Sequence, residues 1–154
     1  MREMNNIPFP PEKKSKVDYM WRDIERRALS YGIAAPKVPA PYPLKDFDLA
    51  NRTAIVANQE GWYMPFLEQT YYAWFVNGLK AGSLENIKRG CEKLGKDYSR
   101  LIEKAAASEI EAIYYTNTQH AKSVGVFGAP SFSVGSDIFW GDDRLEDAIR
   151  FSRL

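Results

Sequence analysis

The C-terminal stretch Gly125–Leu154 constrains the fold more than any other part of the chain. Within it, Ser131–Val134 alternates small polar and apolar residues, the period-2 pattern of a half-buried strand. Gly135 follows, and glycine at the first central position of a two-residue turn permits a tight hairpin. Asp137–Trp140 reads as the return strand, and a capping box that opens at Asp143 predicts a final helix. The stretch therefore predicts a β-hairpin followed by a helix.

The region before this stretch reads as helical. Apolar residues recur there at helical spacing, and glycine, proline and capping residues separate the runs. The predicted helices span residues 15–32, 46–60, 62–78, 83–94, 98–106 and 108–123. Residues 34–44 hold four prolines and are predicted to be a stiff connector. We therefore expect a mostly helical chain in which a helical block precedes the hairpin.

Composition excludes several classes of function. The net charge of +1 gives no electrostatic basis for binding nucleic acid or an anionic membrane. The sequence has no apolar run long enough to cross a bilayer, and its first residues lack the apolar core of a signal peptide. One cysteine, Cys91, allows no intrachain disulfide and no C-x-x-C dithiol chemistry. We expect a cytoplasmic protein.

Several residues have both a structural and a chemical interpretation. Cys91 shares a predicted helical face with Leu84, Ile87 and Leu94, which favours a buried core thiol over a reactive one. His120 is the only histidine, and no cluster of His, Cys and Asp predicts a metal site. An aromatic stripe favours core packing over a ligand cage. It consists of Trp62, Phe66, Tyr71, Trp74 and Phe75.

Three motifs resemble those of the family of 2-hydroxychromene-2-carboxylate isomerases and kappa-class glutathione transferases. They are Thr118–Ala121 (TQHA), Gly125–Pro130 (GVFGAP) and Phe139–Leu145 (FWGDDRL). In that family a G-x-F-G-x-P segment precedes the hairpin, and an F-W-G-x-D-R segment opens the last helix. The resemblance implies an α/β, thioredoxin-like fold of the DsbA and kappa-class type with a large all-α insertion. It implies an insertion domain with its connector at residues 1–124, and a ββα part at residues 125–154.

The resemblance also implies a glutathione site. If the Ala129–Pro130 peptide bond is cis, the backbone of Ala129 points outward and can pair with a short peptide such as glutathione. The carboxylate of Asp143, with Asp142 beside it, suits the γ-glutamyl ammonium. By resemblance we assign cofactor binding to Asn6, Lys16, Ala129, Pro130, Asp142 and Asp143. Structural alternatives stay open: Pro130 as a turn residue, Asp143 as a helix cap and Lys16 as a solvated side chain.

Family members open with a strand–helix–strand segment whose Ser-Pro-Tyr-type motif faces the glutathione thiol. This sequence has no such motif, so we expect the N-terminal βαβ part to be absent and assign no catalytic residue. The implied activity is glutathione-dependent isomerisation of an intermediate of aromatic degradation, with this chain inactive on its own as one expectation. A kappa-class-like transferase or peroxidase is an alternative, and a non-enzymatic remnant or interaction protein is another.

Two further expectations follow from the resemblance. Family members are commonly dimers, so the expected partners are glutathione, a small aromatic-derived substrate and a second copy of the chain. Trp62 and Trp140 are candidates to line an apolar acceptor pocket, although core packing is the favoured use of both.

Overall fold

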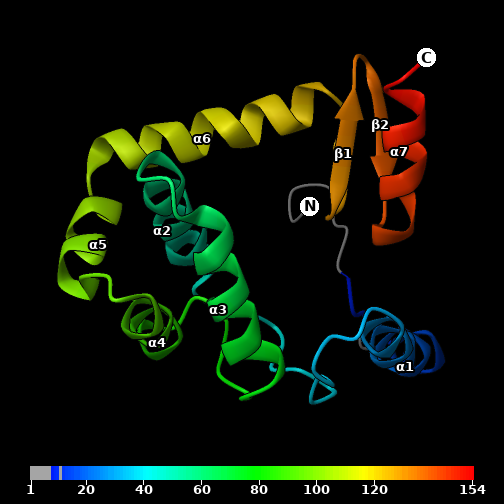
Figure 1. Ribbon diagram of the computed structural model, residues 1–154, viewed down its shortest axis with the longest axis horizontal. Helices are drawn as coiled ribbons and strands as arrows, with labels where there is room; N and C mark the ends of the chain where they lie inside the picture. Colours follow the sequence, from blue (N-terminus) through cyan, green and yellow to red (C-terminus); the bar gives the residue numbers. More distant parts are fainter. Residues whose placement is uncertain (1–7, 11) are drawn as a thin grey trace. The chain divides into compact units, whose positions relative to one another are not determined.

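A computed structural model describes residues 8–10 and 12–154 (Figure 1). Asn6 and Pro11 lie outside the described residues. The helices and strands are α1 (Lys14–Ser30), α2 (Phe47–Gln59), α3 (Tyr63–Phe75), α4 (Leu84–Leu94), α5 (Tyr98–Ala105), α6 (Ser108–Ser123), β1 (Ser131–Val134), β2 (Asp137–Trp140), the 3₁₀ turn η1 (Asp142–Arg144) and α7 (Leu145–Phe151). The chain is mostly helical, as predicted. None of the described helices is both long and apolar enough to cross a membrane.

The described residues form two compact units. One holds residues 12–114, and the other holds residues 8–10 and 115–154. Helix α6 runs from the first unit into the second. The domain boundary expected at residue 124 stays a prediction. The candidate site residues are divided between the two units.

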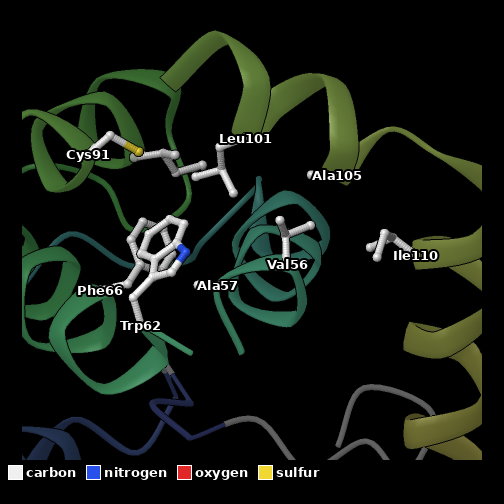
Figure 2. Packing of buried hydrophobic residues seen from close by; sticks show 9 residues of the cluster. Val56, Ala57, Trp62, Phe66, Cys91, Leu101, Ala105 and Ile110 are labelled. Atoms are coloured by element: carbon white, nitrogen blue, oxygen red, sulfur yellow. The ribbon is translucent and has the colours of Figure 1, made fainter. Parts of the chain in front are cut away.

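The larger unit is built around a helical core (Figure 2). Helix α3 packs on α4, and α2 packs on both α3 and α5. The fully buried members of the core come from α2 to α6 and the α2–α3 turn. They are Val56, Ala57, Trp62, Phe66, Ile87, Cys91, Leu101, Ala105 and Ile110. The aromatic stripe is therefore core at its N-terminal end, where Trp62 meets Phe66 edge-on at 5.3 Å between ring centroids.

A hydrogen bond and an ion pair fix the indole of Trp62 at the rim of this core. Its Nε1 donates to Oε2 of Glu60 over 2.9 Å, and Glu60 is also paired with Lys104 of α5. These two interactions lower the pKa of the Glu60 carboxyl. The indole is thus part of the helical unit's packing, so the favoured interpretation of Trp62 as a core residue is confirmed.

Helix α4 buries Ile87 and Cys91 as predicted, but one member of the predicted face lies outside the core. Leu84 was expected to face inward but is 56% exposed, and Asn86 and Gly90 are buried in its place. The side-chain amide of Asn86 donates to the backbone oxygen of Thr70 over 2.9 Å. A Cβ at Gly90 would lie 3.2 Å from Cγ2 of Thr70. Because α3 lies close to α4, the contact is made by the small Gly90 and the hydrogen-bonded amide of Asn86, and Leu84 stays outside it.

Burial explains an expected lack of reactivity at Cys91. The side chain is fully buried, and burial is the main cause that raises the pKa of the thiol to about 11, followed by the nearby carboxylates of Asp97 and Glu92. Because the thiolate is the nucleophile, we expect maleimide to label the native chain at least roughly a hundredfold more slowly than the denatured chain near neutral pH. Mass spectrometry of timed samples measures both rates. Similar rates would contradict the buried position.

The smaller unit contains the predicted hairpin. Strands β1 and β2 are antiparallel, with Phe132 opposite Phe139 and Val134 opposite Asp137. Gly135 has φ of +57°, as expected for the first residue of the tight turn. Helix α7 lies alongside the hairpin (Figure 1), and Phe139 contacts Phe151 of this helix at 5.6 Å between ring centroids. One face of the hairpin is therefore covered by α7.

Candidate functional site

The Ala129–Pro130 turn immediately precedes β1. Its peptide bond is cis, and both residues are exposed. Within the described part of the chain, neither the N–H nor the C=O of Ala129 is hydrogen-bonded. A donor and an acceptor on one exposed residue can pair with the backbone of an extended peptide, as an added strand does. The turn therefore has the backbone groups that the sequence analysis expected there.

Contacts from β2 hold this turn in place. The N–H of Gly141 donates to the backbone oxygen of Pro130 over 3.1 Å. The indole of Trp140 lies against Gly128, where a Cβ would lie only 2.2 Å from Nε1 of Trp140. Phe127 packs against the same indole with its ring tilted by 56°, at 5.0 Å between ring centroids. The two sequence motifs thus meet in space, and this contact leaves no room for a side chain at Gly128.

Asp143 is not the N-cap of the final helix, which corrects the sequence prediction. It lies in the 3₁₀ turn η1, and α7 begins only at Leu145 with no side-chain cap. Instead, Oδ2 of Asp143 is paired with Nη2 of Arg144 at 3.1 Å. A Cβ at Gly141 would lie 2.5 Å from Oδ1 of Asp143. The extra turn moves Asp143 away from the start of α7 and places its carboxylate against Gly141 and Arg144.

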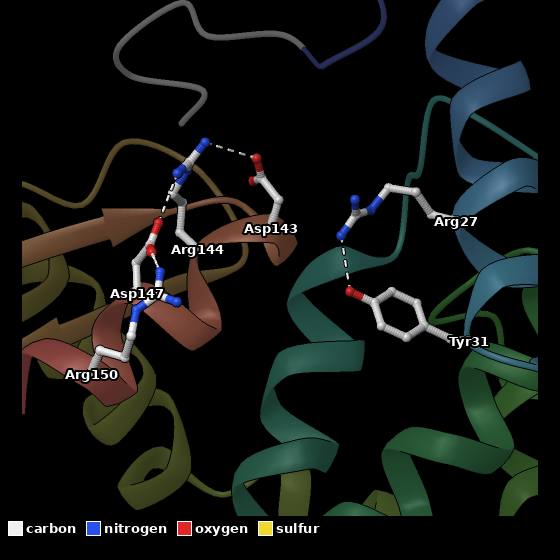
Figure 3. A network of polar contacts seen from close by, with 6 residues as sticks. All are labelled: Arg27, Tyr31, Asp143, Arg144, Asp147 and Arg150. Carbon is white, nitrogen blue, oxygen red and sulfur yellow. Dashed lines mark hydrogen bonds and ion pairs between the residues drawn. The ribbon is translucent and has the colours of Figure 1, made fainter.

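Arg144 connects two carboxylates (Figure 3). Its Nη1 donates to Oδ2 of Asp147 over 2.7 Å, while its Nη2 holds Asp143. Asp147 also pairs with Arg150, one turn further along α7. The carboxylates raise the pKa of the Arg144 guanidinium, and the two arginines lower the pKa of Asp147. This series of ion pairs, from Asp143 through Arg144 and Asp147 to Arg150, orients the Asp143 carboxylate at the surface.

Four of the six predicted site residues lie in the smaller unit. The backbone oxygen of Pro130 accepts a hydrogen bond from the N–H of Gly141. This bond brings the Ala129–Pro130 turn near Asp142 and Asp143. Asp142 is exposed and has a polar contact of its own. Lys16 lies in the first turn of α1 in the larger unit, where it is exposed. Asn6 lies outside the described residues. The assignment of all six to cofactor binding stays a prediction.

Sequence reasoning missed three residues that shape this region. Gly128, Gly141 and Arg144 were read only as parts of motifs. The available signal was spacing: a glycine two residues before Pro130, and an Asp-Arg pair directly after a Gly-Asp pair. Only the structure shows that Gly128 gives room to the indole of Trp140 in β2, and that Gly141 gives room to the carboxylate of Asp143 two residues later.

The sequence model of the DSBA-like thioredoxin domain matches residues 1–149. The chain belongs to the DSBA-like thioredoxin family. Within the family, the chain is 31% identical over 143 residues to the 2-hydroxychromene-2-carboxylate isomerase of Sphingobium xenophagum, covering 92% of this chain and 71% of that protein. It is 29% identical over 140 residues to the protein of the same name from Pseudomonas putida, covering 90% and 66%.

A solved structure of 2-hydroxychromene-2-carboxylate isomerase, in selenomethionine form, has the same fold. It matches with a TM-score of 0.72 at 28% identity, covering 91% of this chain and 69% of that chain. The chain therefore spans roughly two thirds of the length of the relatives it matches. The thioredoxin-like fold of the DsbA type predicted from the motifs is confirmed.

Proposed function

We propose that this chain provides part of a glutathione-dependent isomerase that acts on an unsaturated carboxylate from aromatic degradation. The observation that carries the proposal is the exposed Ala129 backbone, cis to Pro130 and held beside the Gly141–Asp143 turn. Support for the substrate class comes from the two relatives named as 2-hydroxychromene-2-carboxylate isomerases at about 30% identity.

In the proposed complex, glutathione binds as a short extended peptide. The N–H and C=O of Ala129 pair with the backbone of its cysteinyl residue, as in β-strand addition. Asp143 accepts hydrogen bonds from the γ-glutamyl ammonium, with Asp142 adding negative charge beside it. Lys16 and Asn6 keep their assignment to cofactor binding from the family resemblance alone.

The proposed reaction uses glutathione as a recycled nucleophile. Its thiolate adds to one carbon of a conjugated double bond, so the former double bond becomes a single bond that can rotate. Elimination of the same thiolate restores the double bond in the other geometry and returns glutathione unchanged. The chain's own contribution in this scheme is to bind and orient the peptide, because no residue of this chain is assigned to thiol activation.

Calorimetric titration with glutathione tests the binding step, using Asp143→Ala and the control Asp137→Ala. Both positions are exposed aspartates of the smaller unit, but Asp137 lies at the start of β2 beside the hairpin turn. We expect Asp143→Ala to weaken glutathione binding by roughly tenfold or more, since a hydrogen bond to a charged group is lost. Asp137→Ala is expected to bind like the unaltered chain. Equal affinity in all three proteins would contradict the assignment of Asp143.

An activity assay then separates the isomerase from a transferase. The chain is mixed with 2-hydroxychromene-2-carboxylate, with and without glutathione, and the products are separated by chromatography. An isomerase consumes no glutathione, whereas a transferase accumulates a conjugate. Absence of turnover by a chain that does bind glutathione would restrict the proposal to a binding role for this polypeptide.

A further inference from the structure

We propose that Gly141 and Arg144 are positioning residues that fix the Asp143 carboxylate and so set a preference for ligands with a free ammonium group. This inference rests on the proposed glutathione site. Neither residue needs to touch the ligand. Each acts through Asp143, and the two contacts are independent of one another in the structure.

The contact with Gly141 is steric. Its φ of +118° lies in the region that side chains disfavour, and a Cβ here would lie 2.5 Å from Oδ1 of Asp143. The same residue donates its N–H to Pro130. Gly141 therefore joins the two groups proposed to bind glutathione, the backbone of the cis-proline turn and the carboxylate of Asp143.

The contact with Arg144 is ionic and directional. Nη2 of Arg144 holds Oδ2 of Asp143, while Nη1 is anchored on Asp147 (Figure 3). Asp147 is itself paired with Arg150, so the carboxylate that anchors the Arg144 guanidinium is also held in place. One oxygen of Asp143 is therefore paired with the arginine, and the other occupies the space that a Cβ at position 141 would take, so this orientation of the carboxylate requires glycine there.

Charge alone predicts the opposite effect, which makes the inference testable. Arg144 partly neutralises Asp143, so its removal makes the surface more negative and by charge alone would strengthen binding of an ammonium group. Positioning predicts weaker binding after the same change, because the freed carboxylate must be ordered when the ligand binds. Arg153→Gln makes the same change in charge in the smaller unit at an exposed side chain, and no ion pair of Arg153 is found among the described residues, so it is the matched control.

The experiment compares glutathione with glutathione acetylated on its γ-glutamyl amino group, by calorimetry, on the full 154-residue chain. We expect the unaltered chain to prefer the free amine by roughly tenfold or more, and Asp143→Asn to lose this preference. Arg144→Gln and Gly141→Ala are expected to reduce the preference at least roughly threefold. Arg153→Gln and Gly135→Ala are expected to keep it. Gly135 also has a positive φ but has open space around it, so it controls for backbone strain.

The outcomes separate the two proposals. If Arg144→Gln keeps or increases the preference as Arg153→Gln does, the positioning inference is overturned while the glutathione site stands. If the unaltered chain binds neither ligand, or binds both equally, the proposed site is overturned and the inference with it. Arg144→Gln replaces an exposed side chain, so it tests the inference even if Gly141→Ala fails to fold.

Discussion

Replacing Phe66 by alanine is expected to lower the free energy of unfolding by about 3–5 kcal/mol, the usual cost of removing a buried aromatic ring. The side chain is 3% exposed and lies between Trp62, which it meets edge-on, and Gly90 of α4. Its removal opens a cavity between α3 and α4. The two helices are held together by their other contacts and cannot move in to fill the cavity. Because a domain of this size is stable by about 5–15 kcal/mol, the loss is a large share of the total.

Urea denaturation followed by circular dichroism measures this effect through the shift in midpoint. Met64→Ala is the control, since it shortens an apolar side chain of the same helix that is 64% exposed. A surface change of this kind is expected to alter stability by no more than about 0.5 kcal/mol. A midpoint for Phe66→Ala that equals the control would mean that Phe66 does not lie in the core.

Gly82→Ala is expected to lower the free energy of unfolding of the larger unit by more than the cost of placing alanine at a positive φ. Gly82 has φ of +77°, and a Cβ there would lie 2.3 Å from the backbone oxygen of Asp46 and 3.0 Å from Cβ of Ala50. The backbone before α2 cannot move away from the new methyl group without disturbing the start of the helix. We expect about 1–2 kcal/mol from the left-handed conformation and about 1–3 kcal/mol more from the overpacking.

Gly78→Ala separates these two contributions. Gly78 has the same φ of +77°, and nothing lies within 4 Å of a Cβ placed there. The difference between the two variants in thermal or urea unfolding therefore measures the steric part alone. Equal destabilisation by the two substitutions would show that the segment around Gly82 does not press against α2.

Local patterns predicted the hairpin well because its signals lie within a few residues. The alternation in Ser131–Val134 and the glycine at position 135 set strand and turn without help from distant residues. The cap of α4 is equally local, since the hydroxyl of Ser83 accepts from the N–H of Asn86. These interactions close within one turn, so the sequence contains all their partners.

Predictions that depended on the choice among several local partners, or on contacts between distant segments, were less accurate. The Asp-x-x-Glu spacing at Asp143 favoured a helix cap, but the carboxylate instead pairs with Arg144 within a 3₁₀ turn. Leu84 looked like a core residue on α4 until the neighbouring helix was known. The closeness of Gly128 to Trp140 is likewise invisible in a linear sequence, although both residues stood in the motifs that identified the fold.

The packing of Trp140 against the cis-proline turn gives the smaller unit an optical reporter. Trp21 and Trp62 are buried and Trp74 is half-buried, whereas the side chain of Trp140 is 52% exposed. A collisional quencher such as acrylamide therefore reaches the Trp140 indole before the others. Since that indole covers Gly128, one residue from Ala129, a peptide seated on the turn would shield it. The intrinsic fluorescence of the chain can thus follow occupancy of the turn without any label.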